Sequence, residues 1–198
     1  MKKYTLILSI STLLIGTVAI IGWLTSGNDV EKAAVEKPHV LSMTASVDIP
    51  DEMTFAGEKI VFDRYDLRER MDRELNSFTY FHSTTLLLFK RANRIFPVIE
   101  PILKREGVPD DMKYLAVIES SLDHRAVSPA RAVGLWQFIS DTAKLNGLEV
   151  SSEVDERYHI EKSTEAACRY LRNARREYGS WTAAALSYNG GRARITNE

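Results

Sequence analysis

Glu119 is the side chain whose surroundings best suit it to transfer a proton. It is the only acid in KYLAVIESSL, residues 113–122, and it directly follows an apolar run. On a helix, Glu119 shares one stripe with Met112, Leu115 and Ala116. Apolar surroundings disfavour the charged form of a carboxyl group, so its pKa rises. Such a group holds a proton near neutral pH and can donate it, as the general acid does in glycoside cleavage.

The same stretch also fits a structural role. A buried glutamate is more often paired with an arginine or lysine than catalytic, and a glutamate at a helix end can reach solvent. On residues 113–122 alone, we favour the structural role. Two further motifs change that balance.

The two motifs follow the glutamate along the chain. They are GLWQF at residues 134–138 and ALSYNGG at residues 185–191. The order and spacing of IESS, GLWQF and SYN resemble the lytic transglycosylase domain related to goose-type lysozymes. Within that family, the chain is most similar to the membrane-bound lytic murein transglycosylase D group, over roughly residues 47–193.

This resemblance implies a fold, a substrate and a reaction. The fold is all-α, a small lysozyme-like helical domain whose cleft holds the alternating N-acetylglucosamine and N-acetylmuramic acid of peptidoglycan glycan strands. By the resemblance, Glu119 protonates the oxygen that links muramic acid to glucosamine. Its carboxylate then takes the proton of the muramic acid 6-hydroxyl, which attacks the anomeric carbon and leaves a 1,6-anhydro end. Because the substrate supplies its own nucleophile, one acid suffices and we expect no cofactor.

The resemblance also assigns three polar side chains to the cleft. Tyr188 matches the tyrosine that hydrogen-bonds the catalytic glutamate, Asn189 matches a residue that shapes the glycan subsites, and Gln137 matches a sugar contact. Each has a structural alternative. Tyr188 would be a core tyrosine, Asn189 a helix C-cap, and Gln137 a solvated surface amide.

Four more residues near the motifs are expected to bind substrate. Gly134 would let the backbone approach a sugar or would permit tight packing, and Trp136 would stack on a pyranose face or fill the core. Ser120 and Ser121 would orient the carboxylate by hydrogen bonds, or would be ordinary helix-end serines. We expect no metal, because the histidines lack the spacing of a metal site: His39, His82, His124 and His159.

Two other functions stay open. A true hydrolase needs a second carboxylate to position water, and the candidates are Asp123, Asp141 and Asp155. The other open function is binding of glycan without cleavage, by a protein tethered to the membrane. It is suggested by the chain end at Glu198, soon after the SYN motif, because relatives continue through a further helix; we therefore expect a C-terminally truncated domain.

Helices must position these motifs, and apolar residues at helical spacing predict them from Tyr65 onward. The predicted helices lie around residues 65–75, 88–102, 109–122, 132–147, 163–179 and 180–191. Pro97 and Pro101 should break or kink the second helix, Gly107 should end it, and Ser163 should cap the fifth. No alternation typical of strands is present, so the sequence predicts an all-α fold.

The first 63 residues are expected to serve export and attachment. Residues 4–24 are uncharged after two lysines and long enough to span a bilayer, so residues 1–24 predict a signal anchor or a signal peptide. Residues 25–63 predict a polar tether, and residues 64–198 the domain. The protein should thus be exported and anchored to the inner (cytoplasmic) membrane, with its domain in the periplasm or facing the cell wall. A net charge of −1 gives no indication of nucleic-acid binding. The sequence defines no oligomeric state.

Overall fold

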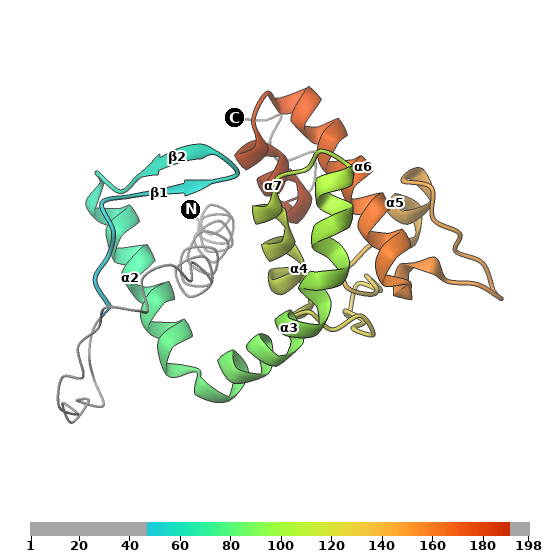
Figure 1. Cartoon of the computed structure of the whole chain (residues 1–198), viewed down its shortest axis with the longest axis horizontal. Helices are drawn as coiled ribbons and strands as arrows, with labels where there is room; N and C mark the ends of the chain where they lie inside the picture. Colours follow the sequence, from blue (N-terminus) through green and yellow to red (C-terminus); the bar gives the residue numbers. More distant parts are fainter. Residues whose placement is uncertain (1–46, 191–198) are drawn as a thin grey trace.

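A computed structural model describes residues 47–190 of the chain. Its elements are β1 (Glu52–Phe55), β2 (Glu58–Val61), α2 (Tyr65–Tyr80), α3 (His82–Arg105), η2 (Asp110–Met112), α4 (Lys113–Ser120), α5 (Ser140–Leu145), η3 (Glu156–Tyr158), α6 (Ile160–Tyr178) and α7 (Trp181–Gly190). Figure 1 shows α3 leading away from α2, which lies with the hairpin of β1 and β2. The helices α4, α6 and α7 gather around the C-terminal half of α3.

The first two predicted helices are confirmed as α2 and α3, but the prolines do not break the second. α3 continues through Pro97 and Pro101 for 24 residues. A proline removes one backbone donor and crowds the preceding turn. The buried side chains of Ile99 and Leu103, on a helix that packs against α4 and α6, compensate for that loss. The predicted end of the helix is confirmed, because α3 stops before Gly107, which has a φ of 66°.

The segment after α4 is not helical, contrary to the helix predicted from residue 132. Isolated bridges join Val133 to Val127 and to Phe138, and α5 begins only after Ile139. Gly134 has a φ of 83° and Gln137 a φ of 48°, which a right-handed helix does not accommodate. The GLWQF motif therefore lies on a loop.

The last two predicted helices are confirmed as α6 and α7, with one shifted boundary. α6 begins directly after His159, so Ser163 is a buried residue of its first turn instead of the N-cap. The helix ends at Gly179, with a φ of 82°, as predicted. The Ser180 hydroxyl accepts a hydrogen bond from the Ala183 N–H at 3.0 Å, which caps α7 where the sequence predicts its start.

β1 and β2 form an antiparallel hairpin at the end of the segment that the sequence predicts as a polar tether, with at most a short extended piece at its end. Phe55 is 1% exposed and belongs to the main core. The Glu58 carboxylate accepts hydrogen bonds from the backbone N–H groups of Trp181 at 2.6 Å and Thr182 at 3.0 Å, at the start of α7. Regular secondary structure is therefore present before residue 64, and the helical fold carries a small sheet.

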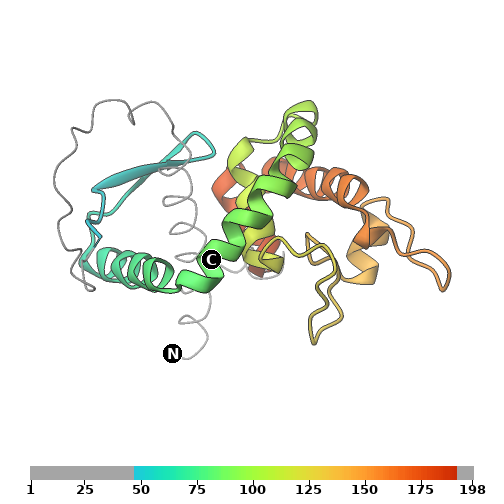
Figure 2. The ribbon, with the colours of Figure 1, turned by 60° about the horizontal axis from the view of Figure 1, so that its bottom comes forward.

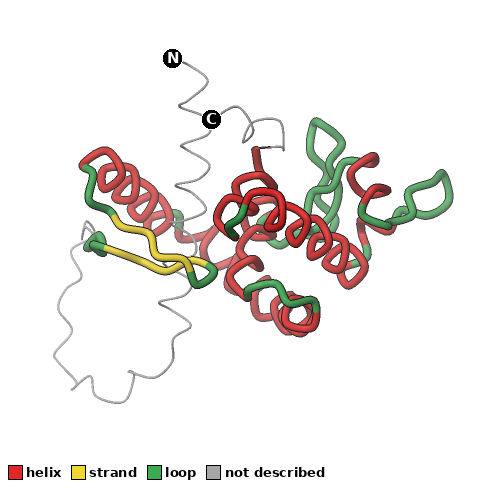
Figure 3. Tube along the Cα trace, turned by 90° about the horizontal axis from the view of Figure 1, so that it is seen from above, coloured by secondary structure: helices red, strands yellow, loops and turns green. Residues whose placement is uncertain are grey.

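The main core is formed by α3, α4, α6, α7 and the loop that carries GLWQF. Leu115 and Ala116 of α4 have no exposed surface, and Leu135 and Trp136 of the loop pack in the same cluster. In Figures 2 and 3 the loops on either side of α5 project from the helical body, away from the hairpin. Leu135 and Trp136 thus attach an otherwise projecting loop to the helix that carries Glu119.

None of the helices within residues 47–190 combines the length and the apolar character that crossing a membrane requires. The predicted membrane segment, residues 4–24, lies outside the described residues.

Candidate active site

Glu119 occupies the last turn of α4, on the border between the core and solvent. Its helix neighbours Leu115 and Ala116 are fully buried, while Glu119 itself is partly exposed. Burial raises the pKa of its carboxyl group from 4.5 to about 7, and a hydrogen bond from Asn189 acts in the opposite direction. The carboxyl group is therefore half protonated near neutral pH, as the role of proton donor expected for it requires.

Asn189 reaches this carboxyl group from α7. Its Nδ2 donates a hydrogen bond to Glu119 Oε1 at 3.2 Å, across 70 residues of sequence. It lies inside α7, which runs to Gly190, so within the described residues it is not a C-cap. No lysine, arginine or histidine of residues 47–190 forms an ion pair with Glu119.

Tyr188 does not hydrogen-bond Glu119, contrary to the role that the resemblance assigned. Its hydroxyl donates to the Trp136 carbonyl oxygen at 2.7 Å. Its ring packs edge to face against Trp136, Phe138 and Tyr170, with the centroid of Tyr170 at 5.0 Å. Burial, and then the negative charge of Glu119, raises the pKa of Tyr188 well above the usual value for tyrosine. Tyr188 is thus a neutral donor that holds the GLWQF loop beside the carboxyl group.

Three carbonyl groups of the loop are bound by three different elements. Ser120 of α4 places its hydroxyl 2.9 Å from the Leu135 carbonyl oxygen, and Tyr188 of α7 binds the Trp136 carbonyl. Arg157 of η3 donates to the Phe138 carbonyl at 3.1 Å and is itself held by the Asp155 carboxylate at 2.6 Å. The predicted site serine Ser120 therefore fixes the loop and does not orient the Glu119 carboxyl group.

Gly134 and Trp136 pack against protein, not against substrate. A Cβ atom at Gly134 would lie 2.0 Å from the Arg157 carbonyl oxygen, so only glycine fits there. Trp136 is 0% exposed, and its indole Nε1 donates to the Thr164 hydroxyl at 2.9 Å. The predicted stacking of Trp136 on a sugar is wrong, because a ring without exposed surface cannot meet a pyranose. For both residues the packing alternative holds.

Gln137 lies at the edge of the loop and faces a pocket. Its Nε2 donates to the carbonyl oxygens of Gly134 at 2.9 Å and Ala126 at 3.2 Å, which stabilises its unusual backbone conformation. The amide is therefore not simply solvated, as its alternative supposed. It lines the same pocket as Tyr188 and Asn189.

This pocket, beside Glu119, has a volume of about 660 Å³ and a neutral wall. The described residues that line it are Gln137, Phe138, Ile139, Thr142, Leu145, Asn146, Tyr170, Asn173, Tyr188 and Asn189. None of them carries a charge at neutral pH, and they include four side-chain amides and three aromatic rings. Amides offer both donors and acceptors to hydroxyl and N-acetyl groups, and aromatic faces suit sugar rings.

Sequence reasoning missed the part of this wall that α5 and α6 contribute. Asn146 reads as a helix C-cap signal, and it does end α5. Tyr170 and Asn173 lie in the long periodic pattern of α6, and no motif distinguishes them from core and surface residues. Only the tertiary packing of α6 against α7 brings these side chains to Tyr188.

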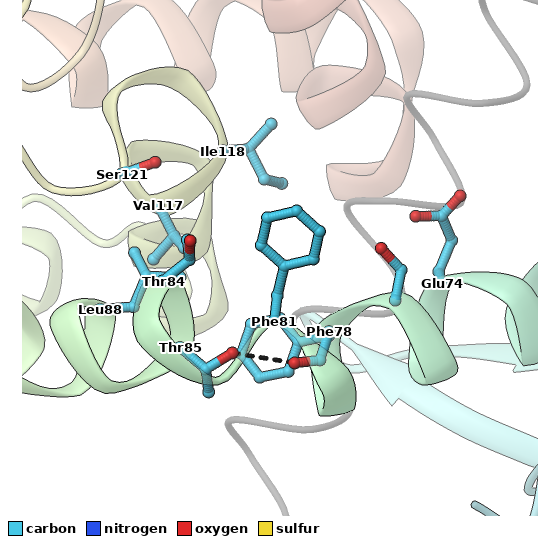
Figure 4. Close-up of a pocket in the computed structure, with 10 residues that line it drawn as sticks. Glu74, Phe78, Phe81, Thr84, Thr85, Leu88, Val117, Ile118 and Ser121 are labelled. Carbon is cyan, nitrogen blue, oxygen red and sulfur yellow. Dashed lines mark hydrogen bonds between the residues drawn. The ribbon is translucent and has the colours of Figure 1, made fainter. Parts of the chain in front are cut away.

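Ser121 lies on the other side of α4, at a second and smaller pocket. That pocket has a volume of about 240 Å³, and Figure 4 shows it between the α2–α3 junction and the end of α4. Its wall is mainly apolar, with Phe78, Phe81 and Ile118, and the Thr85 hydroxyl donates to the Phe78 carbonyl at 2.8 Å. Ser121 is exposed and has a φ of 52°, so it ends α4; no bond to the Glu119 carboxyl group is formed.

The three candidate second carboxylates point to other partners or to solvent. Asp123 accepts a hydrogen bond from Arg91 at 3.1 Å, and Asp155 is bound by Arg157. Asp141 is exposed in the first turn of α5. No cluster of three or more His, Cys, Asp or Glu side chains in residues 47–190 could hold a metal ion.

Comparison with known proteins agrees with this geometry. The family model for the transglycosylase SLT domain matches residues 96–198. The membrane-bound lytic murein transglycosylase D of Escherichia coli K12 is 28% identical over 149 residues, which cover 73% of this chain and 32% of that protein; its counterpart from strain O6:H1 gives the same values. A putative tributyltin chloride resistance protein of Alteromonas sp. strain M-1 is 26% identical over 117 residues, 59% of this chain and 56% of its own length. The chain spans about a third of the length of the two E. coli relatives.

The matched residues 96–198 contain Gln137, Phe138, Tyr188 and Asn189, which line the neutral pocket, and Glu119, which is hydrogen-bonded to Asn189. This match covers more than half of the chain. The chain therefore belongs to the transglycosylase SLT domain family.

Proposed function

We propose that this protein cleaves the β-1,4 bond between N-acetylmuramic acid and N-acetylglucosamine in peptidoglycan without water, and leaves 1,6-anhydromuramic acid ends. The observation that carries the proposal is a single, largely buried carboxyl group, Glu119, with a pKa of about 7 beside a neutral pocket of amides and aromatic rings. Family membership and the name of the E. coli relatives support the substrate class.

The reaction needs one group that gives a proton and then takes one. Protonated Glu119 donates its proton to the glycosidic oxygen as the bond from that oxygen to the anomeric carbon breaks. The muramic acid 6-oxygen then bonds to the anomeric carbon, and its proton passes to the Glu119 carboxylate. A pKa near the working pH suits both steps, because neither form of the acid is strongly disfavoured. Between the two proton transfers, the hydrogen bond from Asn189 stabilises the Glu119 carboxylate.

The neutral wall favours this lyase over a hydrolase. Hydrolysis of the usual kind uses two carboxyl groups on either side of the bond, one of which activates water or attacks the sugar. Asp123 and Asp155 are occupied by arginines, and the wall described beside Glu119 contains no acid. A nucleophile supplied by the substrate removes the need for the second acid.

We further propose that the domain works at the outer face of the cytoplasmic membrane, where it meets the cell wall. The uncharged run of residues 4–24 would anchor it there, and the E. coli relatives are named as membrane-bound. Retention of the full-length protein in the membrane fraction, and its release when residues 1–24 are deleted, would support this location.

The mass of the products from purified peptidoglycan tests the proposed reaction. Wild-type protein should release fragments that are lighter by one water than hydrolysis products and that lack a reducing end. Glu119→Gln should release them at least about 10²- to 10⁴-fold more slowly. Glu153→Gln, which neutralises an exposed acid on a loop, should act like wild type. Products with a reducing end would show a hydrolase, and sedimentation with cell wall without soluble fragments would show a binding protein.

A further inference from the structure

The chain turns sharply directly after Glu119, in a conformation that costs energy. Ser121 has a φ of 52° and Leu122 a φ of 59°, so two successive residues with side chains lie in the left-handed region. Each costs roughly 1–2 kcal/mol relative to a right-handed conformation. Such strain persists only where surrounding contacts determine the backbone, and it is concentrated near functional sites.

Local bonds and burial account for part of that support. The Ser121 N–H donates to the Val117 carbonyl at 2.8 Å, and the Leu122 N–H donates to the Ala116 carbonyl at 3.3 Å, which closes the end of α4. The Leu122 side chain is 0% exposed. The two backbone bonds hold the turn to its own helix, and the buried side chain of Leu122 packs it into the main core.

Arg91 of α3 adds hydrogen bonds from a neighbouring helix to this turn. One of its guanidinium nitrogens donates to the Ser121 carbonyl oxygen at 2.9 Å, and another donates to Asp123 Oδ2 at 3.1 Å. The other oxygen of Asp123 accepts from the Arg125 N–H at 3.0 Å, so the carboxylate is itself held in place. A planar guanidinium that binds two acceptors at once fixes direction as well as distance.

We propose that Arg91 is a positioning residue for Glu119: by clamping the left-handed turn to α3, it sets the direction in which the carboxyl group projects toward Asn189. Glu119 lies two residues before Ser121, so a rotation of the end of α4 would carry its side chain away from α7. The carboxyl group is then located from two sides, through its backbone by α3 and through Oε1 by α7. The catalytic part of this inference rests on the proposed function.

The contact between Arg91 and Asp123 could also be an ordinary surface ion pair without any role in positioning Glu119. The side chains of Arg91 and Asp123 are 22% and 34% exposed, and pairs near a surface contribute little stability. That explanation predicts a small loss of stability and no effect on Glu119. The two explanations therefore differ in what happens to the carboxyl group.

Three variants of the full-length protein separate them. Arg91→Gln removes the clamp, and Arg91→Lys keeps the charge but cannot bind both acceptors in the same plane. Arg94→Gln is the matched control, because it removes the same charge from the same helix at an exposed position. Assays are made on soluble glycan strands at a temperature at which circular dichroism shows each variant folded. If Arg91→Gln does not fold, Arg91→Lys carries the test.

We expect Arg91→Gln to lower kcat by about 10- to 100-fold with KM within about twofold of wild type, because misplacement of a catalytic group acts on the chemical step. Arg91→Lys should lie between Arg91→Gln and wild type, and Arg94→Gln should equal wild type. Equal kcat in Arg91→Gln and Arg94→Gln, or a loss confined to KM, would overturn the proposal.

Titration of the Glu119 carboxyl carbon by NMR gives a second reading that needs no activity. The Asn189 hydrogen bond favours the charged carboxylate, so its weakening should raise the pKa of Glu119 in both Arg91→Gln and Arg91→Lys. A rise in Arg91→Lys cannot come from lost charge. An unchanged midpoint in both variants would refute positioning. If the wild type cleaves nothing, the proposed function fails, and this titration still decides the role of Arg91.

Discussion

At the scale of single residues, the environment of Glu119 is what the sequence predicts best. The apolar residues on its helical stripe predict burial, and burial is the main cause of its raised pKa. Its partner could not be predicted in the same way, because the contact with Asn189 spans 70 residues and depends on how α7 packs. The resemblance assigned this contact to Tyr188, the residue before Asn189. In the structure, the Tyr188 hydroxyl instead donates to the Trp136 carbonyl oxygen.

A raised pKa makes the fold less stable as pH increases. Below about pH 4.5, Glu119 is protonated in both the folded and the unfolded chain and contributes no difference. Between 4.5 and about 7 the unfolded chain loses this proton while the folded chain keeps it, so the free energy of unfolding falls. Above that window the cost is fully present, and a shift of this size corresponds to about 3 kcal/mol.

Glu119→Gln should therefore be as stable as wild type near pH 4 and more stable by about 3 kcal/mol at pH 8. Urea unfolding of both proteins across this range measures the difference. The exposed variant Glu153→Gln corrects for the general effect of removing an acid. A difference that does not change with pH would mean that the pKa of Glu119 is not raised.

At the scale of elements, the loop with GLWQF departs most from the sequence prediction. Its apolar residues allow a helical pattern, but bonds to its carbonyl groups from Ser120, Tyr188 and Arg157 replace the bonds of a helix. Positive φ angles at Gly134 and Gln137 then turn the chain so that Leu135 and Trp136 are buried. These long-range donors leave no local pattern in the sequence, although the glycine is a signal for an unusual backbone.

Gly134→Ala should destabilise the protein by more than about 3 kcal/mol, because its methyl group would overlap the Arg157 carbonyl at a position that is already left-handed. Gly107→Ala is the matched control. Gly107 also has a positive φ, of 66°, but no atom lies within 4 Å of its added carbon, so about 1 kcal/mol is expected. Thermal unfolding of both variants measures the contrast, and equal losses would remove the proposed packing role of Gly134.

At the scale of the whole molecule, the hairpin joins the start of the described chain to the helix that carries Tyr188 and Asn189. The hairpin could not be predicted from the sequence, because each strand has only four residues and only Phe55 among them is deeply buried. Glu58 receives two backbone N–H groups at the first turn of α7, where a negative charge also favours the helix dipole. The segment predicted as a tether therefore supports the site from 123 residues away.

Glu58→Ala should cost about 1–2 kcal/mol of stability, in the range of other lost helix caps, and should lower activity by loosening α7. Glu52→Ala removes an acid from the same hairpin, but its ion pair with Lys59 is more than half exposed, so less than about 1 kcal/mol is expected. Denaturant unfolding and release of soluble fragments from cell wall compare the two variants. If Glu52→Ala proves as harmful as Glu58→Ala, the cap does not support α7.

The protonation of Glu119 is the claim on which the proposed chemistry depends, and it can be measured directly. Carbon-13 NMR of glutamate-labelled protein follows the carboxyl carbon of Glu119, which is assigned by its disappearance in Glu119→Gln. We predict a midpoint of about 7. A midpoint near 4.5, the ordinary value for glutamate, would contradict the account, because Glu119 would then hold no proton to donate at neutral pH.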